Sequence, residues 1–83
     1  MKKKVLFVCS ANTCRSAVAA AILIEYGHRQ YDVSSAGIYA RSGEPMHREC
    51  AEALEEIFGH GYSAYNHTST KLNYQHLMNA DVI

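Results

Sequence analysis

The residues that decide the fold of this chain are Cys9-Ser10-Ala11-Asn12-Thr13-Cys14-Arg15-Ser16. An apolar run, Val5-Leu6-Phe7-Val8, precedes them, and an alanine-rich run, 17–23, follows. A buried strand, a tight polar loop and a helix in that order bring the loop amides and the free N–H groups of the helix start around one point. The sequence therefore predicts an anion-binding loop with the Cys9 thiol at its floor.

The residue types in this loop suit nucleophilic chemistry on a phosphoryl group. A thiol reacts as its thiolate, and its pKa of about 8.5 can fall to roughly 3.5–7.5 beside cations and helix N-termini. Arg15 offers a planar set of donors that matches two phosphoryl oxygens, and the Ser16 hydroxyl can hydrogen-bond the Cys9 sulfur. The alternative is a buried structural Cys9 beside an arginine that starts a helix.

The segment 5–16 resembles the N-terminal signature of the low molecular weight protein phosphatases, a family of tyrosine phosphatases, arginine phosphatases and related arsenate reductases. The resemblance continues, with less specific motifs, over essentially all 83 residues. It implies that Cys9, Arg15 and Ser16 are catalytic. It also implies a set of phosphate-binding loop residues, namely Ser10, Ala11, Asn12, Thr13, Cys14 and Arg15.

Further residues acquire expected roles from the resemblance. A hydrogen-bond network that supports the loop is expected to include Asn12, Ser35 and His67, although a turn residue, a strand end and a surface histidine are the plain alternatives. Thr13 and Tyr39 are expected at the substrate-facing lip. The residue type at this loop position, Thr13, resembles that of the family's arginine phosphatases. Phosphoarginine is therefore as good a candidate substrate as phosphotyrosine.

The chain contains three cysteines, an odd number. Cys9 and Cys14 are a candidate redox pair whose reversible disulfide would protect the nucleophile, and a small packing residue is the alternative role of Cys14. Cys50 is expected in the core. Their spacing lacks the second half of a zinc site, so no metal or cofactor is expected.

Local patterns predict the elements around the loop. Residues 4–9 form a continuous apolar run typical of a buried parallel strand, 15–27 an alanine-rich helix, and 31–35 a second strand. A loop from Ala36 to Pro45 leads to an amphipathic helix from Met46 to about Phe58. The expected stop signals are Gly59 and Gly61, and the expected cap of a third helix, carrying Leu72, Leu77 and Met78, is Ser69 or Thr70.

Residues 81–83 look like the opening of a third strand. The predicted fold class is therefore α/β: a small parallel sheet with helices on both faces, of order second, first, third by the resemblance. Residues 1–83 form a single phosphatase-like domain, either incomplete or naturally short. Eight basic and eight acidic residues balance, so neither nucleic acid nor a membrane is expected as a partner, and a working thiolate suits the cytoplasm.

The chain departs from the family pattern in one serious respect. The full domain of the family is nearly twice as long, and its general acid is an Asp in an Asp-Pro loop. This sequence has no Asp-Pro, and Asp32 and Asp81 are its only aspartates. A general acid typically contributes 10²–10⁴-fold, so turnover is expected to be weakened. The third strand would also leave an edge unpaired, which predicts a homodimer or oligomer.

These patterns predict a protein phosphatase that attacks phosphotyrosine or phosphoarginine through a phosphocysteine intermediate. Its expected partners are a phosphorylated protein and inorganic phosphate or sulfate in the loop. The alternative is a catalytically impaired module that binds phosphate or phosphoproteins. Arsenate reduction is a weaker alternative, because the related reductases use two further cysteines late in the domain.

Overall fold

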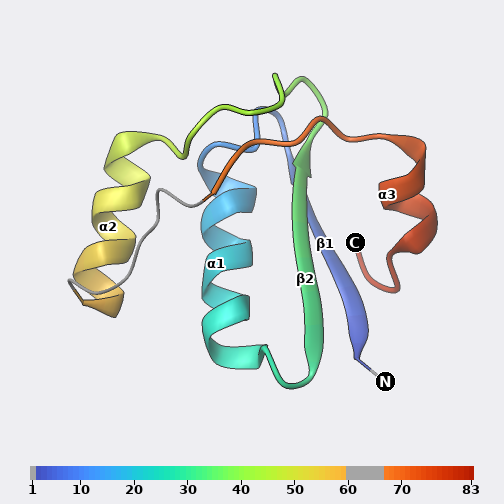
Figure 1. Ribbon diagram of the computed structural model, residues 1–83, viewed down its shortest axis with the longest axis horizontal. Helices are drawn as coiled ribbons and strands as arrows, with labels where there is room; N and C mark the ends of the chain where they lie inside the picture. The colour runs from blue at the N-terminus through green and yellow to red at the C-terminus, as the bar shows by residue number, and fades with distance from the viewer. Residues whose placement is uncertain (1, 60–66) are drawn as a thin grey trace.

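The computed structural model describes residues 2–59 and 67–83. At its centre lies a parallel two-stranded sheet of β1 (Lys3–Cys9) and β2 (Tyr31–Gly37), paired along the full length of both strands (Figure 1). β2 continues beyond the predicted end at Ser35. The carboxyl ends of both strands therefore meet at one edge of the sheet, where the loop begins.

Helix α1 (Arg15–Gly27) connects the two strands and covers one face of the sheet. Its buried residues include Ala17, Ala20 and Ala21, whose short side chains allow neighbouring elements to approach closely. The helix ends at Gly27, as the sequence predicts. The predicted strand–helix–strand unit is confirmed.

Helix α2 (Arg48–Phe58) packs on α1, where Ala51 and Leu54 join the buried cluster of Ala17, Ala21 and Met46. The predicted helix start at Met46 was wrong. Met46 is buried ahead of the helix, and His47 is the N-cap residue, whose Nδ1 accepts a hydrogen bond from the Glu49 amide at 3.3 Å. The helix ends before Gly59, whose φ of 95° only glycine adopts easily. The second expected stop signal, Gly61, lies outside the described residues.

Helix α3 (Tyr74–Asn79) begins at a different cap from the one predicted. Asn73 accepts from the His76 amide through Oδ1 and donates its own amide to His76 Nδ1, each at 3.0 Å, which forms a capping box. Ser69 and Thr70 lie upstream, and Leu72 precedes the helix. The Ser69 amide donates to the Glu44 carbonyl, and the Thr70 amide donates to Asn12 Oδ1 in the loop.

The end of the chain reaches the sheet through a single bridge. Val82 pairs in parallel with Val5, and the Leu6 amide donates to the Val82 carbonyl at 2.9 Å. Because Val5 also pairs with Val33 of β2, Val82 lies on the other edge of β1. The described residues therefore contain a bridge where the sequence predicts a third strand, in the expected order.

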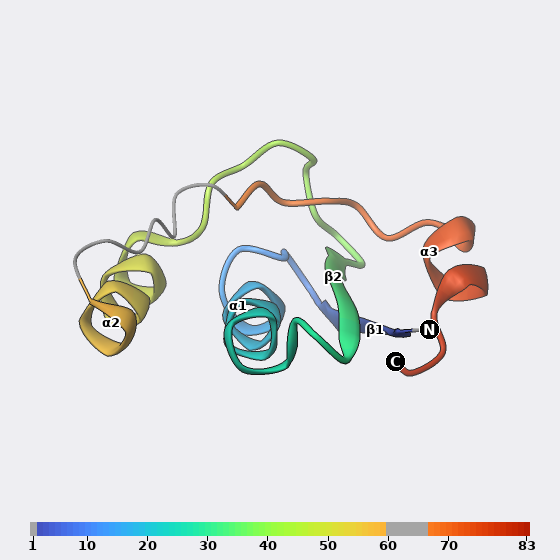
Figure 2. The same cartoon turned by 60° about the horizontal axis from the view of Figure 1, so that its bottom comes forward.

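The elements form layers around the sheet. Figure 2 shows α1 on one side of the sheet and α3 on the other, with α2 outside α1. The predicted helices on both faces are thus present. None of the described helices has both the length and the apolar character needed to cross a membrane.

Candidate active site

The loop between β1 and α1 curls around the Cys9 sulfur. Asn12, at the centre of the loop, is fully buried and has a φ of 57°, in the left-handed region that turns successive amides to one side. Its amide lies 3.4 Å from the Cys9 Sγ, and the amides of Ala11 and Ser16 also hydrogen-bond the sulfur. The sulfur therefore faces a ring of backbone donors at the start of α1.

A short chain of side-chain hydrogen bonds orients the Ser16 hydroxyl. Asn12 Nδ2 donates to Ser16 Oγ at 2.8 Å, so the hydroxyl hydrogen is free to point at the Cys9 Sγ, 2.9 Å away. Burial raises the pKa of the Cys9 thiol, but the hydrogen bonds from the Ser16 hydroxyl and the loop amides outweigh it. The net effect lowers the pKa below its ordinary value, because these donors favour the thiolate.

The segment after residue 66 supports the loop from outside. His67 Nε2 lies 2.7 Å from the Asn12 carbonyl oxygen, an acceptor, so this ring nitrogen carries the proton. The Thr70 amide donates to Asn12 Oδ1 at 2.8 Å. Ser69, which is buried, accepts from the Glu44 amide at 2.9 Å and donates to the Arg41 carbonyl. His67 thus lies where the sequence places it, against the loop.

The end of β2 forms the wall behind the loop. A Cβ built on Gly37 would lie 2.6 Å from the Ser10 oxygen and 2.8 Å from the Asn12 nitrogen, so only glycine allows this approach. The amide of Ile38 donates to the Cys9 carbonyl and that of Tyr39 to the Ser10 carbonyl, at 2.9 and 2.8 Å. The loop backbone is therefore anchored directly to the chain that leaves β2.

Of the two expected lip residues, Thr13 lies within the loop and Tyr39 follows β2 beside it. Tyr39 is 81% exposed and is joined to Ser10 through its backbone. Thr13 is half-buried, and its carbonyl accepts from the His47 amide at 2.7 Å. Neither residue belongs to the buried core.

The structure does not bring two of the predicted site residues into the hydrogen-bond network. Arg15 is the first residue of α1; it is exposed, and its guanidinium forms no hydrogen bond or ion pair with any other described residue. Ser35 is half-buried in β2, and its hydroxyl bonds to none of the described groups. The Thr70 amide is a support of Asn12 that sequence reasoning missed.

The cysteines pair differently from the prediction. Cys14 forms a disulfide with Cys50, their Cα atoms 5.8 Å apart, and Cys9 is the free cysteine. The physical reason is direction: the Cys9 sulfur faces Ser16 and the loop amides, while Cys14, at the start of α1, faces the first turn of α2. Cys50 also packs against the core, as expected. No group of His, Cys, Asp or Glu within 2–59 and 67–83 could hold a metal ion.

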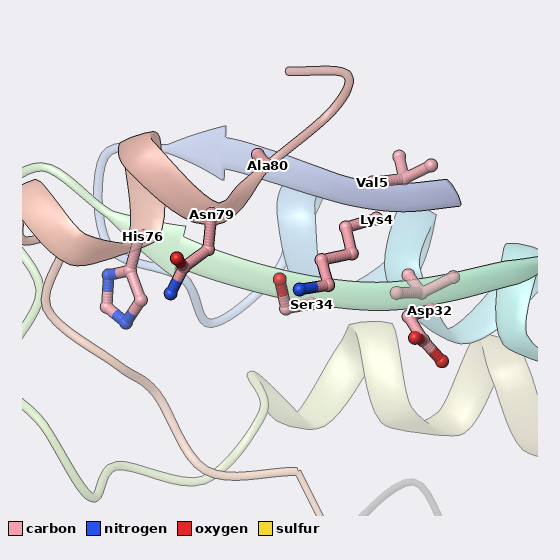
Figure 3. Close-up of a pocket in the computed structure, with 8 residues that line it drawn as sticks. Lys4, Val5, Asp32, Ser34, His76, Asn79 and Ala80 are labelled. Atoms are coloured by element: carbon pink, nitrogen blue, oxygen red, sulfur yellow. The ribbon is translucent and has the colours of Figure 1, made fainter. Parts of the chain in front are cut away.

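A hollow of about 210 Å³ lies elsewhere, between the sheet and α3 (Figure 3). Lys4, Asp32 and His76 are among its lining residues, and Lys4 and Asp32 stand at the amino ends of β1 and β2. Ligands of parallel sheets bind at the carboxyl ends of the strands, where Cys9 lies. The loop, rather than this hollow, is therefore the candidate site.

The supports that sequence reasoning missed act mainly through the backbone. His47 and Thr70 contribute amide hydrogens, which any residue except proline carries, so their side chains give no signal. Gly37 had a readable signal, since a glycine at the end of a strand often marks a close backbone approach.

Known proteins with similar sequences and structures identify the family. The profile of the family described as low molecular weight phosphotyrosine protein phosphatase matches residues 4–83. The protein-arginine-phosphatase of Bacillus subtilis strain 168 is 33% identical over 82 residues, which cover 95% of this chain and 52% of that protein. The arsenate reductase of Halalkalibacterium halodurans is also 33% identical over 82 residues, covering 99% and 55%.

A solved structure agrees with these relatives. The low molecular weight protein tyrosine phosphatase from T. tengcongensis superposes with a TM-score of 0.87 at 32% identity, covering 99% of this chain and 57% of that one. The chain spans about half the length of the curated relatives it matches. From the family profile, the sequence identity and the shared fold together, the chain belongs to the low molecular weight phosphotyrosine protein phosphatase family.

Proposed function

We propose that this chain carries the nucleophile and phosphate-binding loop of a cysteine-dependent protein phosphatase. The observation that carries the proposal is the Cys9 sulfur, whose pKa is lowered by the Ser16 hydroxyl and by amides converging from the loop. A thiolate inside such a ring can act as a nucleophile, and the amides around it can bind the oxygens of the group that it attacks.

The proposed reaction begins with attack of the Cys9 sulfur on phosphorus. A phosphorus–sulfur bond forms while the bond to the leaving oxygen or nitrogen breaks, and the amides of the loop bind the phosphoryl oxygens. The unpaired, exposed Arg15 guanidinium is free to turn over the loop and bind two of these oxygens. Water then cleaves the phosphocysteine, releasing phosphate and the thiolate, and Ser16 stabilises that departing thiolate.

Phosphoarginine is the substrate we favour, with phosphotyrosine second. Two observations support this preference. The sequence of the chain is similar to that of a curated protein-arginine-phosphatase, and the residue type at Thr13 resembles that of the arginine phosphatases. Thr13 lies in the loop, and the exposed Tyr39 is joined to the loop through its backbone, so both are near the place where a substrate side chain would lie. The proposed partners are accordingly phosphorylated proteins, with the cytoplasm as the expected compartment.

Neither aspartate of the chain lies where it could protonate the leaving group. Asp81 accepts a hydrogen bond from the Lys4 amide at 2.8 Å, and Asp32 is exposed at the amino end of β2. Both therefore stand at the end of the sheet opposite Cys9. We expect turnover by the 83-residue chain to be slower by about 10²–10⁴-fold than with a positioned acid.

The test compares phosphoarginine and phosphotyrosine peptides, with the chain in excess and phosphate release as the readout. We expect release from phosphoarginine by the wild type and none by Cys9→Ser, which should still bind inorganic phosphate through the loop amides. Release that persists in Cys9→Ser would overturn the role of Cys9. Phosphate binding without release from either peptide would select a binding module.

Arsenate reduction is the second candidate, favoured by the 33% identity to an arsenate reductase. Reducing arsenate to arsenite takes two electrons, which two thiols supply as they form a disulfide. Loss of two thiols per arsenate added to the reduced chain, measured by thiol titration, would support it. Unchanged thiols in arsenate would exclude it.

A further inference from the structure

The Cys14–Cys50 disulfide joins the loop to the outermost helix of the molecule. Cys14 is the last loop residue and the N-cap of α1, and Cys50 lies in the first turn of α2. Figure 2 shows α2 outside α1, on the side away from the sheet. The bond therefore links the element farthest from the sheet to the backbone that surrounds the Cys9 sulfur.

Few other contacts connect α2 with the loop. The His47 amide, at the N-cap of α2, donates to the Thr13 carbonyl at 2.7 Å. The rest of α2 packs on α1 through Ala51 and Leu54, away from the loop. Among the described residues, the loop therefore contacts the start of α2 chiefly through one hydrogen bond and one covalent bond, of which the covalent bond can be broken chemically.

The disulfide is open to a small reagent. Cys14 and Cys50 are each half-buried, and both line a hollow of about 520 Å³ between α1 and α2. The other lining residues are Arg15, Val18, Ala19, Ile22, Glu49 and Ala53. In a reducing compartment, a disulfide that reagents can reach is usually a transient, regulated bond.

We propose that the Cys14–Cys50 disulfide is a thiol–disulfide exchange site whose reduction by a dithiol loosens the loop and weakens its hold on phosphate. A thiolate of the dithiol attacks one of the two sulfurs, the bond between them breaks, and the departing thiolate takes up a proton. The second thiol then releases the mixed disulfide, so two electrons pass from the dithiol to the two cysteines. The inference rests on the proposed phosphate-binding role of the loop.

The effect on phosphate follows from preorganisation. The bond fixes Cys14, which adjoins Thr13 and closes the ring of amides. The oxidised loop is therefore less free to move, and it loses less conformational entropy when the anion binds. Reduction restores that freedom. The disulfide also keeps Cys14 from pairing with Cys9, which leaves the nucleophile as the free thiol. Oxidised protein is thus the form with the better-organised site.

The test measures binding of inorganic phosphate by calorimetry, in oxidised and in reduced dithiothreitol, with thiol titration to verify cleavage. For the wild type we expect a dissociation constant at least about fivefold higher after reduction. The double variant Cys14→Ser/Cys50→Ser, in which Cys9 has no other cysteine to pair with, should bind as weakly as the reduced wild type and should not respond to the dithiol. Ala53→Ser, on the same hollow, keeps the disulfide and should retain the wild-type response.

A second measurement uses only the wild type. Coupling between two binding equilibria is reciprocal, so saturating phosphate must raise the ratio of reduced to oxidised dithiothreitol needed for half-reduction by the same factor. Equal phosphate affinity in both redox states, with cleavage verified, would overturn the proposal. A dithiol response that persists in Cys14→Ser/Cys50→Ser would also overturn it, since Cys9 is then the only cysteine left. Absence of phosphate binding in both states would overturn the loop assignment itself.

Discussion

Asn12 meets three requirements that few side chains combine. It adopts a φ of 57°, donates to Ser16 through Nδ2, and accepts from the Thr70 amide through Oδ1. Aspartate could accept but not donate, and glycine could adopt the angle but bridge nothing. The residue at this position therefore determines both the path of the loop and the direction of the Ser16 hydroxyl toward the sulfur.

The hydrogen bond from Ser16 to the sulfur gives a direct prediction for Ser16→Ala. Removing the hydroxyl removes a donor that favours the thiolate, so the pKa of Cys9 should rise. The measurement is the pH dependence of iodoacetamide labelling of Cys9 in the oxidised chain. The midpoint should lie below the ordinary thiol pKa in the wild type and at higher pH in Ser16→Ala.

The matched control is Ser34→Ala, an exposed serine of β2 that should leave the labelling midpoint unchanged. Because the folded pKa is lowered, the thiolate stabilises the fold above the unfolded pKa, and this contribution is lost as pH falls through the folded pKa. Ser16→Ala should therefore lose more stability at high pH than at low pH. Identical midpoints in Ser16→Ala and the wild type would contradict the assigned hydrogen bond.

Among the individual residues of the site, those that act through side-chain chemistry could be predicted from the sequence. Cys9, Asn12 and Ser16 stand within one loop, and their donors and acceptors explain why they meet. The partner of Cys14 could not be inferred, because it depends on how α2 packs against α1 rather than on spacing along the chain.

Among the secondary-structure elements, the strands and α1 were predictable because local pattern and tertiary packing agree. Continuous apolar residues formed β1, and an alanine-rich run formed α1 up to its glycine. The starts of α2 and α3 were not predictable from apolar spacing. Met46 is buried without being helical, and the cap of α3 is Asn73, whose reciprocal bonds with His76 outcompete the serine and threonine upstream.

The meeting of β2 with the loop predicts the effect of Gly37→Ala. The added Cβ would approach backbone atoms of Ser10 and Asn12, which cannot rotate away as a side chain can. We expect a loss of about 1–3 kcal/mol in the free energy of unfolding, as for overpacking, together with weakened phosphate binding. Denaturant unfolding and a phosphate titration measure the two effects.

Gly43→Ala provides the comparison for this experiment. Gly43 has a φ of 93° and no atom within 4 Å of a built Cβ, so the substitution should cost stability by backbone strain of about 1–2 kcal/mol. Phosphate affinity should remain that of the wild type. Loss of phosphate binding in both variants, or in neither, would argue against a specific contact between β2 and the loop.

For the whole molecule, the sheet is narrow and one edge is almost unpaired. The described chain contributes β1, β2 and the bridge at Val82, while apolar side chains near that edge remain exposed, Val82 by 45% and Ile83 by 68%. Unpaired edges template association with another chain. The topology could be predicted from the sequence, but how far residues 81–83 pair with β1 depends on tertiary contacts beyond the local pattern.

We therefore predict that the 83-residue chain forms a homodimer through this edge. Light scattering should give twice the monomer mass for the wild type and the monomer mass for Ile83→Lys, because a charged edge resists pairing. Ile57→Lys, at an exposed apolar position of α2, is the matched control and should stay dimeric. A monomeric wild type, or a dimer that only Ile57→Lys dissociates, would contradict edge pairing.

The bond from the Thr70 amide to Asn12 has a consequence for how this region tolerates mutation. Selection at position 70 acts on a peptide hydrogen, so chains that differ freely in this side chain can preserve the same active loop. Proline is the exception, because it alone lacks that hydrogen. Sequence variability there would therefore be a poor guide to how much the geometry of the loop depends on the position.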